Sequence, residues 1–206
     1  MAREEADLGG RQAAPGRLSS LLTDHGPGLS RNELKQLVRT VPDFPSSGIQ
    51  FRDITTLLAH GEGLSASVDM LAGMAADLGA TKVAGIEARG FIFGTALALR
   101  LGVGFVPIRK AGKLPVECIG EDYALEYGEA RVELDPSIIG SDDKVLVVDD
   151  LLATGGTALA AVRLLRRAGA EVSHALFVID LPELGGAGAL AEEGITTHAL
   201  IDFAGH

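Results

Sequence analysis

The sequence predicts an α/β fold in which helices flank a central, mostly parallel sheet. Between about residues 64 and 201, short apolar runs of strand length alternate with longer stretches of helical periodicity. Strands that are apolar throughout are typical of parallel sheets with both faces covered. A helix-length stretch between consecutive strands is the connection that parallel pairing requires.

The elements follow in chain order. Residues 1–29 are rich in Gly, Ala and Arg and contain helix breakers, so we expect a flexible N-terminal extension with room for a short helix at 17–23. Ser30 and Glu33 form a capping box for the next helix, which ends before Pro42. The later pattern predicts helices at 64–78, 91–101, 157–168 and 187–193, and strands at 83–86, 103–108, 145–148, 174–179 and 197–201.

Residues 111–136 interrupt this alternation. The segment begins with a basic, glycine-containing turn and then alternates polar and apolar residues with a period of two. That period predicts antiparallel strands. Because a long connection inside a compact domain commonly serves function, we expect an excursion that covers a site and ends in antiparallel strands.

Composition excludes several classes of function. The 206 residues carry 28 acidic and 18 basic side chains, a net charge of −10, which argues against coating nucleic acid or an anionic membrane. The single cysteine, Cys118, cannot form an internal disulfide, and the start of the chain lacks the apolar region of a signal peptide. The longest apolar run, at 90–99, is too short to span a bilayer. We expect a cytoplasmic protein with no nucleic-acid or membrane partner.

The strongest functional signal follows the strand predicted at 145–148. Two carboxylates, Asp149 and Asp150, lead into a loop of small residues that opens a helix, namely Ala153, Thr154, Gly155, Gly156 and Thr157. Small residues let backbone amides approach an anion, and the helix N-terminus adds about half a positive charge, so the loop suits a phosphate. Acceptors beyond the carboxyl end of a strand can hold the vicinal hydroxyls of a ribose, directly or with a metal. The plainer interpretation is that Asp150 and Thr154 cap the helix and the glycines form a tight turn.

Residues 145–157 closely resemble the donor-binding signature of the type I phosphoribosyltransferase family. Further blocks resemble the adenine-specific branch of that family, in its order and at natural spacings: VPDFP with GIQFRDI at 41–54, GIEARGFIFG at 85–94, IRKAGKLP at 108–115 and LEYG at 125–128. The resemblance covers about residues 31–203. It implies a type I phosphoribosyltransferase fold over 30–206, with a small hood at about 30–55 and a long flexible flap at about 110–127.

The resemblance also implies an activity. It predicts a purine-salvage enzyme that converts adenine and 5-phospho-α-D-ribose 1-diphosphate (the donor) to AMP and diphosphate through an oxocarbenium-like transition state. Mg²⁺ is the expected cofactor, held mainly by substrate and water, and a homodimer is the expected assembly. Two alternatives stay open: a donor-sensing regulator without turnover, and the same reaction on another base such as xanthine or hypoxanthine. The regulator is disfavoured because the stretch before Phe51 carries no basic recognition helix.

Roles in donor binding are implied residue by residue. Asp149 and Asp150 would engage the ribose, and the loop at 153–157 would hold the 5′-phosphate. The diphosphate would lie against Glu87, Ala88, Arg89, Arg109, Lys110 and Lys113. The resemblance places a cis peptide between Glu87 and Ala88, and a guanidinium such as that of Arg89 can bind diphosphate in a bidentate fork. The plainer alternatives are that Arg89 merely pairs with a nearby carboxylate and that the basic run is a solvated turn.

Roles in base binding and catalysis are implied in the same way. Adenine would lie against Phe51 on one face and Leu181 on the other, with the main chain of Gln50 and Arg52 at its edge. The catalytic residues would be Glu126 and Arg89, since a carboxylate can stabilise an oxocarbenium ion or accept the purine proton. Taken alone, Glu126 would face solvent and Phe51 would simply pack. The histidines fit no metal spacing, and we expect His174 to be a core or interface residue.

Overall fold

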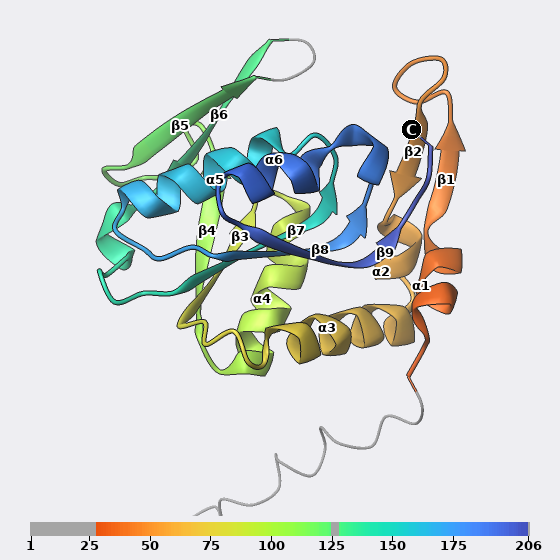
Figure 1. Ribbon diagram of the computed structural model, residues 1–206, viewed down its shortest axis with the longest axis horizontal. Helices are drawn as coiled ribbons and strands as arrows, with labels where there is room; N and C mark the ends of the chain where they lie inside the picture. Colours follow the sequence, from red (N-terminus) through yellow and green to blue (C-terminus); the bar gives the residue numbers. More distant parts are fainter. Residues whose placement is uncertain (1–27, 125–127, 206) are drawn as a thin grey trace, which may run out of the picture.

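The computed structural model describes residues 28–124 and 128–205 (Figure 1). At its centre lies a seven-stranded sheet with the strand order β5 (Ile119–Ala124), β6 (Glu129–Leu134), β4 (Gly104–Lys110), β3 (Lys82–Ile86), β7 (Val145–Leu152), β8 (His174–Asp180) and β9 (Thr196–Asp202). Strands β4, β3, β7, β8 and β9 are parallel, whereas β6 runs antiparallel to both of its neighbours. The predicted fold class and the predicted antiparallel strands are confirmed.

Helices cover both faces of the sheet (Figure 1). They are α1 (Arg31–Leu37), α2 (Thr55–Leu58), α3 (Gly61–Ala75), α4 (Arg89–Leu101), α5 (Gly156–Arg167) and α6 (Gly186–Glu192), with short 3₁₀ turns at Pro136–Ile138 and Pro182–Leu184. Successive residues of β7 show the two layers: Val147 packs with the α5 side, and Leu146 and Val148 pack with the α3 and α4 side. Because β7 is apolar on both faces, it contributes to the hydrophobic cores on both sides of the sheet.

The predicted hood folds as α1 and a two-stranded antiparallel sheet of β1 (Arg39–Pro42) and β2 (Gln50–Asp53). The capping box is present, because the Ser30 hydroxyl accepts from the Glu33 amide and the Glu33 carboxylate accepts from the Ser30 amide at 2.7 Å. The extension and the short helix expected before residue 28 lie outside the described residues.

The strand predicted at 145–148 is too short. Strand β7 continues to Leu152 because it stays paired with β8 as far as Leu152 opposite Asp180, whereas its pairing with β3 ends at Val148. Asp149 and Asp150 therefore lie inside the strand, whereas from the sequence they were expected beyond its end. Both residues lie past the end of the pairing with β3 but are still within the pairing with β8, which leaves space beside them on the β3 side.

Helix starts were also misplaced. Helix α4 begins at Arg89 and not at residue 91, and α3 spans 61–75 and not 64–78. The start of α3 is set by His60, whose Nδ1 accepts from the Gly63 amide at 3.1 Å, a capping role that the sequence pattern did not suggest. In the described parts of the chain, no helix combines the length and apolar character that a membrane crossing requires.

Candidate active site

A cavity of about 310 Å³ opens where β3 and β7 end and α5 begins. Its walls are residues 86–89, Lys110, Tyr123 and residues 149–158. The structure thus brings together the predicted ribose residues, the predicted phosphate loop and part of the predicted diphosphate set. The cavity lies at the carboxyl edge of the parallel strands, where open α/β sheets bind ligands.

The loop before α5 is shaped by a left-handed glycine. Gly155 has φ +85° and occupies the N-cap position without a side-chain cap, so the capping interpretation of Thr154 is wrong. The first amides of a helix have no partner within it and are available to an anion.

A second glycine, Gly186 at the start of α6, packs beneath this loop. Its amide donates to the Ala153 carbonyl at 3.0 Å, and a Cβ there would lie 2.3 Å from the same oxygen. Only glycine allows this close approach. Sequence patterns missed Gly186 because it follows the loop by about thirty residues and belongs to no motif there.

The two carboxylates occupy different environments. Asp150 is buried and forms an ion pair with Arg89, whose side chain is 54% exposed. Burial raises the pKa of Asp149 well above the usual range, and the Asp150 carboxylate adds to the effect, whereas the charge of Arg89 opposes it. Asp149 Oδ1 accepts from the Asp150 amide at 2.9 Å, which opposes the rise only in part. The charged form of Asp149 is therefore less favourable here than that of an exposed carboxyl group.

The predicted diphosphate loop is fixed by Glu87. Its carboxylate accepts from the Lys110 amide at 2.9 Å and from Arg109 Nε at 3.0 Å. The Lys110 amide is the main cause that holds the pKa of Glu87 below its usual range, with smaller contributions from Arg109 and Lys113. The peptide between Glu87 and Ala88 is cis, as the family resemblance implies.

Glycines bring this loop against β7. A Cβ on Gly90 would lie 2.7 Å from the Val148 carbonyl and 2.9 Å from Asp149 Oδ1, and one on Gly85 would lie 2.7 Å from the Gly90 carbonyl. Helix α4 can therefore start directly beside the paired carboxylates, which places Arg89 within reach of Asp150.

The residues expected to bind adenine lie outside this cavity. Phe51 is half-buried in β2 and meets Phe44 edge to face, with ring centroids 5.2 Å apart. Leu181 is buried, and its amide donates to the Leu152 carbonyl at 2.9 Å. One candidate face of the base site thus belongs to the hood, and the other follows β8, next to the end of β7.

Comparison with known proteins identifies the family. The model of the phosphoribosyl transferase domain matches residues 50–187. The adenine phosphoribosyltransferase of Novosphingobium aromaticivorans is 66% identical over 178 residues, which cover 86% of this chain and 100% of that protein. The chain belongs to the adenine phosphoribosyltransferase family. It is a pentosyl-transferring enzyme of purine salvage, in a family that makes AMP from adenine and the donor.

Solved structures of adenine phosphoribosyltransferases share the fold. The enzyme of Thermoanaerobacter pseudethanolicus matches with a TM-score of 0.81 and 42% identity, over 84% of this chain and 100% of that one. The enzyme of Saccharomyces cerevisiae, solved with adenine and an imino-altritol bisphosphate, matches with a TM-score of 0.77 and 37% identity, over 83% and 98%. The type I phosphoribosyltransferase fold predicted from the motifs is confirmed.

Not every predicted site residue of this phosphoribosyltransferase reaches the cavity wall. Arg109, which forms an ion pair with Glu87, and Lys113 are not among the residues that line it, and Glu126 lies outside the described residues. Tyr123 of β5 does line the cavity, although the sequence had not marked it. In the sequence, its place in a segment of period-two alternation gave a signal for a strand but none for this site.

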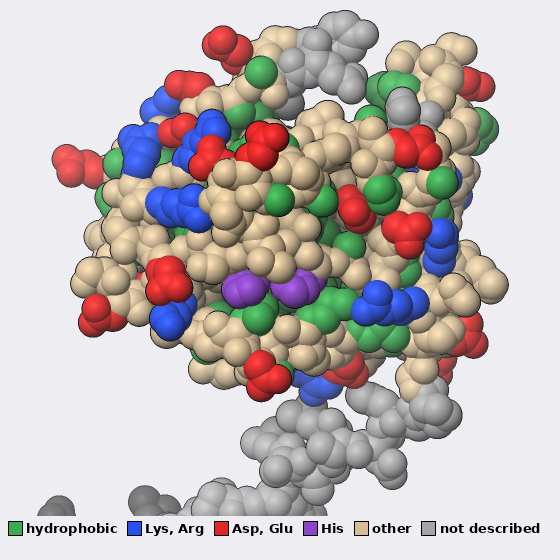
Figure 2. Space-filling view, in the orientation of Figure 1, with side chains coloured by type: hydrophobic (Ala, Val, Ile, Leu, Met, Phe, Trp, Pro, Cys, Tyr) green, Lys and Arg blue, Asp and Glu red, His purple; other side chains and the backbone are tan. Residues whose placement is uncertain are grey.

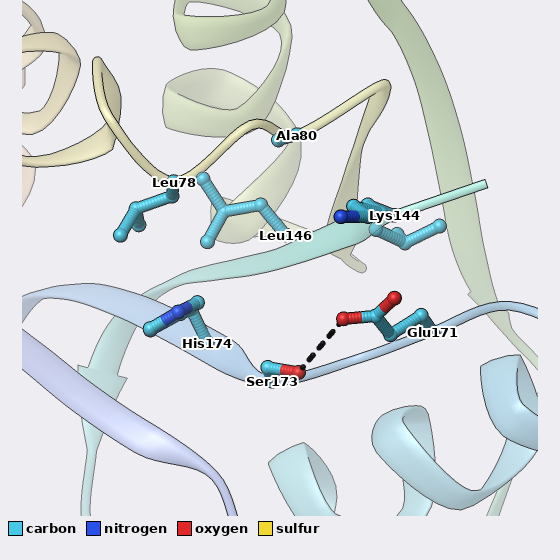
Figure 3. A pocket seen from close by; sticks show the side chains of 8 residues that line it. Leu78, Ala80, Lys144, Leu146, Glu171, Ser173 and His174 are labelled. Carbon is cyan, nitrogen blue, oxygen red and sulfur yellow. Dashed lines mark hydrogen bonds between the residues drawn. The ribbon is translucent and has the colours of Figure 1, made fainter.

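A smaller hollow of about 150 Å³ lies at the opposite edge of the sheet (Figure 3). Lys144, Glu171, Ser173 and His174 line it together with apolar side chains. Next to it His174 and His198 are adjacent, with ring nitrogens 3.5 Å apart, and Figure 2 shows two histidines side by side on this face. His174 is thus a half-buried strand residue at the amino edge, away from the phosphoribosyltransferase cavity.

Proposed function

We propose that the cavity transfers the 5-phosphoribosyl group from the donor to N9 of adenine through an oxocarbenium-like transition state. The observation that carries this proposal is the meeting, in one cavity, of the Gly155 loop, the Asp149–Asp150 pair and Arg89. The Gly155 loop would receive the phosphate, the two carboxylates the ribose diol and Arg89 the diphosphate, so each of the three parts of the donor has a partner in the cavity.

Each part of the donor has a proposed partner. The loop at 153–157 receives the 5′-phosphate through free amides. Asp149 and Asp150 accept from the ribose hydroxyls, and these hydrogen bonds would oppose the rise in the pKa of Asp149. Arg89 turns from Asp150 toward the diphosphate, and its exposed guanidinium leaves room for that movement. Lys110, Arg109 and Lys113 supply further positive charge beside Glu87 and Ala88.

Magnesium fits the proposed site as a cofactor shared with the substrate. Among the described residues, no three His, Cys, Asp or Glu side chains form a metal-ligand set, whereas Asp149 and Asp150 offer the hard oxygen ligands that Mg²⁺ prefers. Bound with the donor, the ion would neutralise charge on the departing diphosphate. The remaining ligands would be donor oxygens and water.

The base would enter between Phe51 and Leu181, with the main chain of Gln50 and Arg52 at its edge. Glu126 would stabilise the cationic ribosyl centre or accept the purine proton. Most of the rate enhancement would come from positioning and charge stabilisation. A cytoplasmic location and a homodimer stay predictions of the sequence and its family resemblance.

Product formation from a panel of bases tests the activity. With Mg²⁺ and the donor present, adenine should give AMP and diphosphate, while hypoxanthine and xanthine should give little nucleotide. Turnover of another base without turnover of adenine would assign a different substrate. Tight donor binding without turnover of any base would instead favour the regulator.

Replacement of Glu126 tests its catalytic role. Glu126→Ala should lower kcat about 100-fold or more while changing donor affinity little, because general acid–base groups contribute about 10²–10⁴-fold. Steady-state kinetics and a donor titration measure both quantities. Glu129→Ala, at the exposed start of β6, is the matched control and should keep full activity. An unchanged kcat in Glu126→Ala would return Glu126 to a solvent-facing role.

A further inference from the structure

The segment that follows β9, Phe203–Gly205, runs beside the hood (Figure 1). Arg52 of β2 donates through Nη2 to the carbonyls of Ala204 and Gly205, at 3.2 and 3.4 Å. Through Nη1 it donates to the Thr40 hydroxyl of β1 at 2.6 Å. One guanidinium therefore joins both strands of the hood to this segment.

The same segment is tied to the central sheet. The Phe203 amide donates to the Asp180 carbonyl at 3.0 Å, and Asp180 is the last residue of β8, immediately before Leu181. The Phe203 ring lies under Arg52, with the guanidinium carbon 4.6 Å from its centroid. A short chain of contacts thus runs from Arg52 through Phe203 to Asp180.

These contacts from Arg52 to Asp180 link the two residues expected to enclose the base. Arg52 adjoins Phe51 in β2, and Asp180 adjoins Leu181 after β8. A flat base needs contact with both faces at about 3.5–4 Å, so a small shift of the hood would lose one contact. Arg52 has little freedom to follow such a shift, because its guanidinium is a rigid planar fork engaged with three oxygens.

The environment of one atom of the half-buried Arg52 supports a role beyond surface pairing. Its Nε is buried without a hydrogen-bond partner, a costly arrangement that folded proteins seldom keep. The other nitrogens and the ring of Phe203 hold the side chain in place despite that cost. The arrangement is accounted for if the position of β2 relative to β8 matters.

We propose that Arg52 and Phe203 are positioning residues that set the separation between Phe51 and Leu181, and thereby the affinity for adenine. The proposal rests on the proposed function, since it takes the space between Phe51 and Leu181 as the base site. Neither side chain touches the donor-binding cavity, whose walls come from other residues. Their replacement should therefore affect the base and leave the donor untouched.

Kinetics with both substrates varied tests this separation of effects. Arg52→Ala should lower kcat/KM for adenine about tenfold to 100-fold, mainly through KM, with the KM of the donor nearly unchanged. Arg52→Lys, which keeps a cation near Phe203, should recover part of the loss. Phe203→Leu, which keeps the backbone bond to Asp180, should show a smaller effect than Arg52→Ala.

Lys35→Ala is the matched control. Lys35 also lies over the Phe203 ring, 4.9 Å from its centroid, and forms a loose pair with Asp202 at 3.8 Å, but it makes no bond to the segment backbone. Its loss should leave both KM values unchanged. Thermal unfolding of each variant ensures that folded proteins are compared.

The outcomes separate this proposal from the proposed function. Two results with folded Arg52→Lys and Phe203→Leu would overturn the positioning role: equal changes in the KM values of adenine and the donor, or no change in either. The proposed function would still stand if the unaltered protein turns over adenine. Absence of adenine turnover by the unaltered protein would overturn the proposed function and this inference with it.

Discussion

At the residue scale, the two neighbouring carboxylates of this site lie in different environments. Asp150 is compensated by Arg89, whereas burial raises the pKa of Asp149. A raised pKa means that the folded protein retains a proton that the unfolded chain has released. Between the unfolded and folded pKa values, stability therefore falls as pH rises.

Asp149→Asn should remove this pH dependence. The variant should be more stable than the unaltered protein at about pH 8, by on the order of 1 kcal/mol, and similar to it near pH 4, because an amide cannot ionise. Thermal unfolding at several pH values measures the difference, and the variant should also lose donor binding in a calorimetric titration. Asp150→Asn is the contrasting change and should destabilise, since it leaves Arg89 without its partner. An equal gain in stability for Asp149→Asn at both pH values would contradict the raised pKa of Asp149.

The residues of one contiguous motif were expected from the sequence to lie together, and they do, whereas their roles stay predictions. Asp149, Asp150 and the loop at 153–157 line one cavity as expected. Tyr123 and Gly186 were missed because they reach the same place from distant elements, and no local pattern records such packing. The ion pair expected for Arg89 on general grounds is present, but its partner Asp150 is itself a proposed donor-binding residue.

At the element scale, the junction of β3 and α4 depends on close backbone approach. Gly90→Ala should destabilise the fold by about 1–3 kcal/mol, since its Cβ would meet a β7 carbonyl that cannot move aside. It should also lower donor affinity by displacing Arg89. Denaturant unfolding and a donor titration measure the two effects.

Gly73→Ala controls for the helical propensity of alanine. Gly73 lies in α3 with nothing near its would-be Cβ, so this change should stabilise by up to about 1 kcal/mol. A Gly90→Ala variant as stable as the unaltered protein would show that the junction can relax.

Element bounds were predicted less well than element order. Every strand of the parallel sheet was expected from its apolar run, but β7 and β4 continue through charged residues that read as loop. Pairing with β8 on one side is enough to keep Asp149 and Asp150 extended. Such one-sided pairing depends on a neighbour distant in the sequence, which local periodicity does not contain.

At the scale of the whole molecule, a catalytic unit shorter than this chain exists in the family. The relative from Novosphingobium aromaticivorans is matched along its full length by 178 of the 206 residues here. Removal of residues 1–27 should therefore leave kcat and both KM values within about twofold, a difference below about 0.5 kcal/mol. Steady-state kinetics and light scattering compare the two forms. A large fall in activity or a change in oligomer size would show that the segment has a function.

The sequence carries a net charge of −10, and on the face seen in Figure 2 acidic and basic side chains are interspersed. At about 0.15 M salt, exposed charges beyond about 8 Å are largely screened. The local groups of the cavity therefore govern anion binding more than the total does.

The ion pairs described above also give the empty site a means of discrimination. Arg89 and Arg109 already face the carboxylates of Asp150 and Glu87 before any ligand arrives. To bind at Arg89 or Arg109, chloride or sulfate would have to displace these carboxylates. A sugar diphosphate offers anionic oxygens to the guanidinium of Arg89 and hydroxyl donors to the Asp150 carboxylate that it releases. In the proposed binding mode, this exchange of partners would favour a ligand that carries both kinds of group over a simple anion.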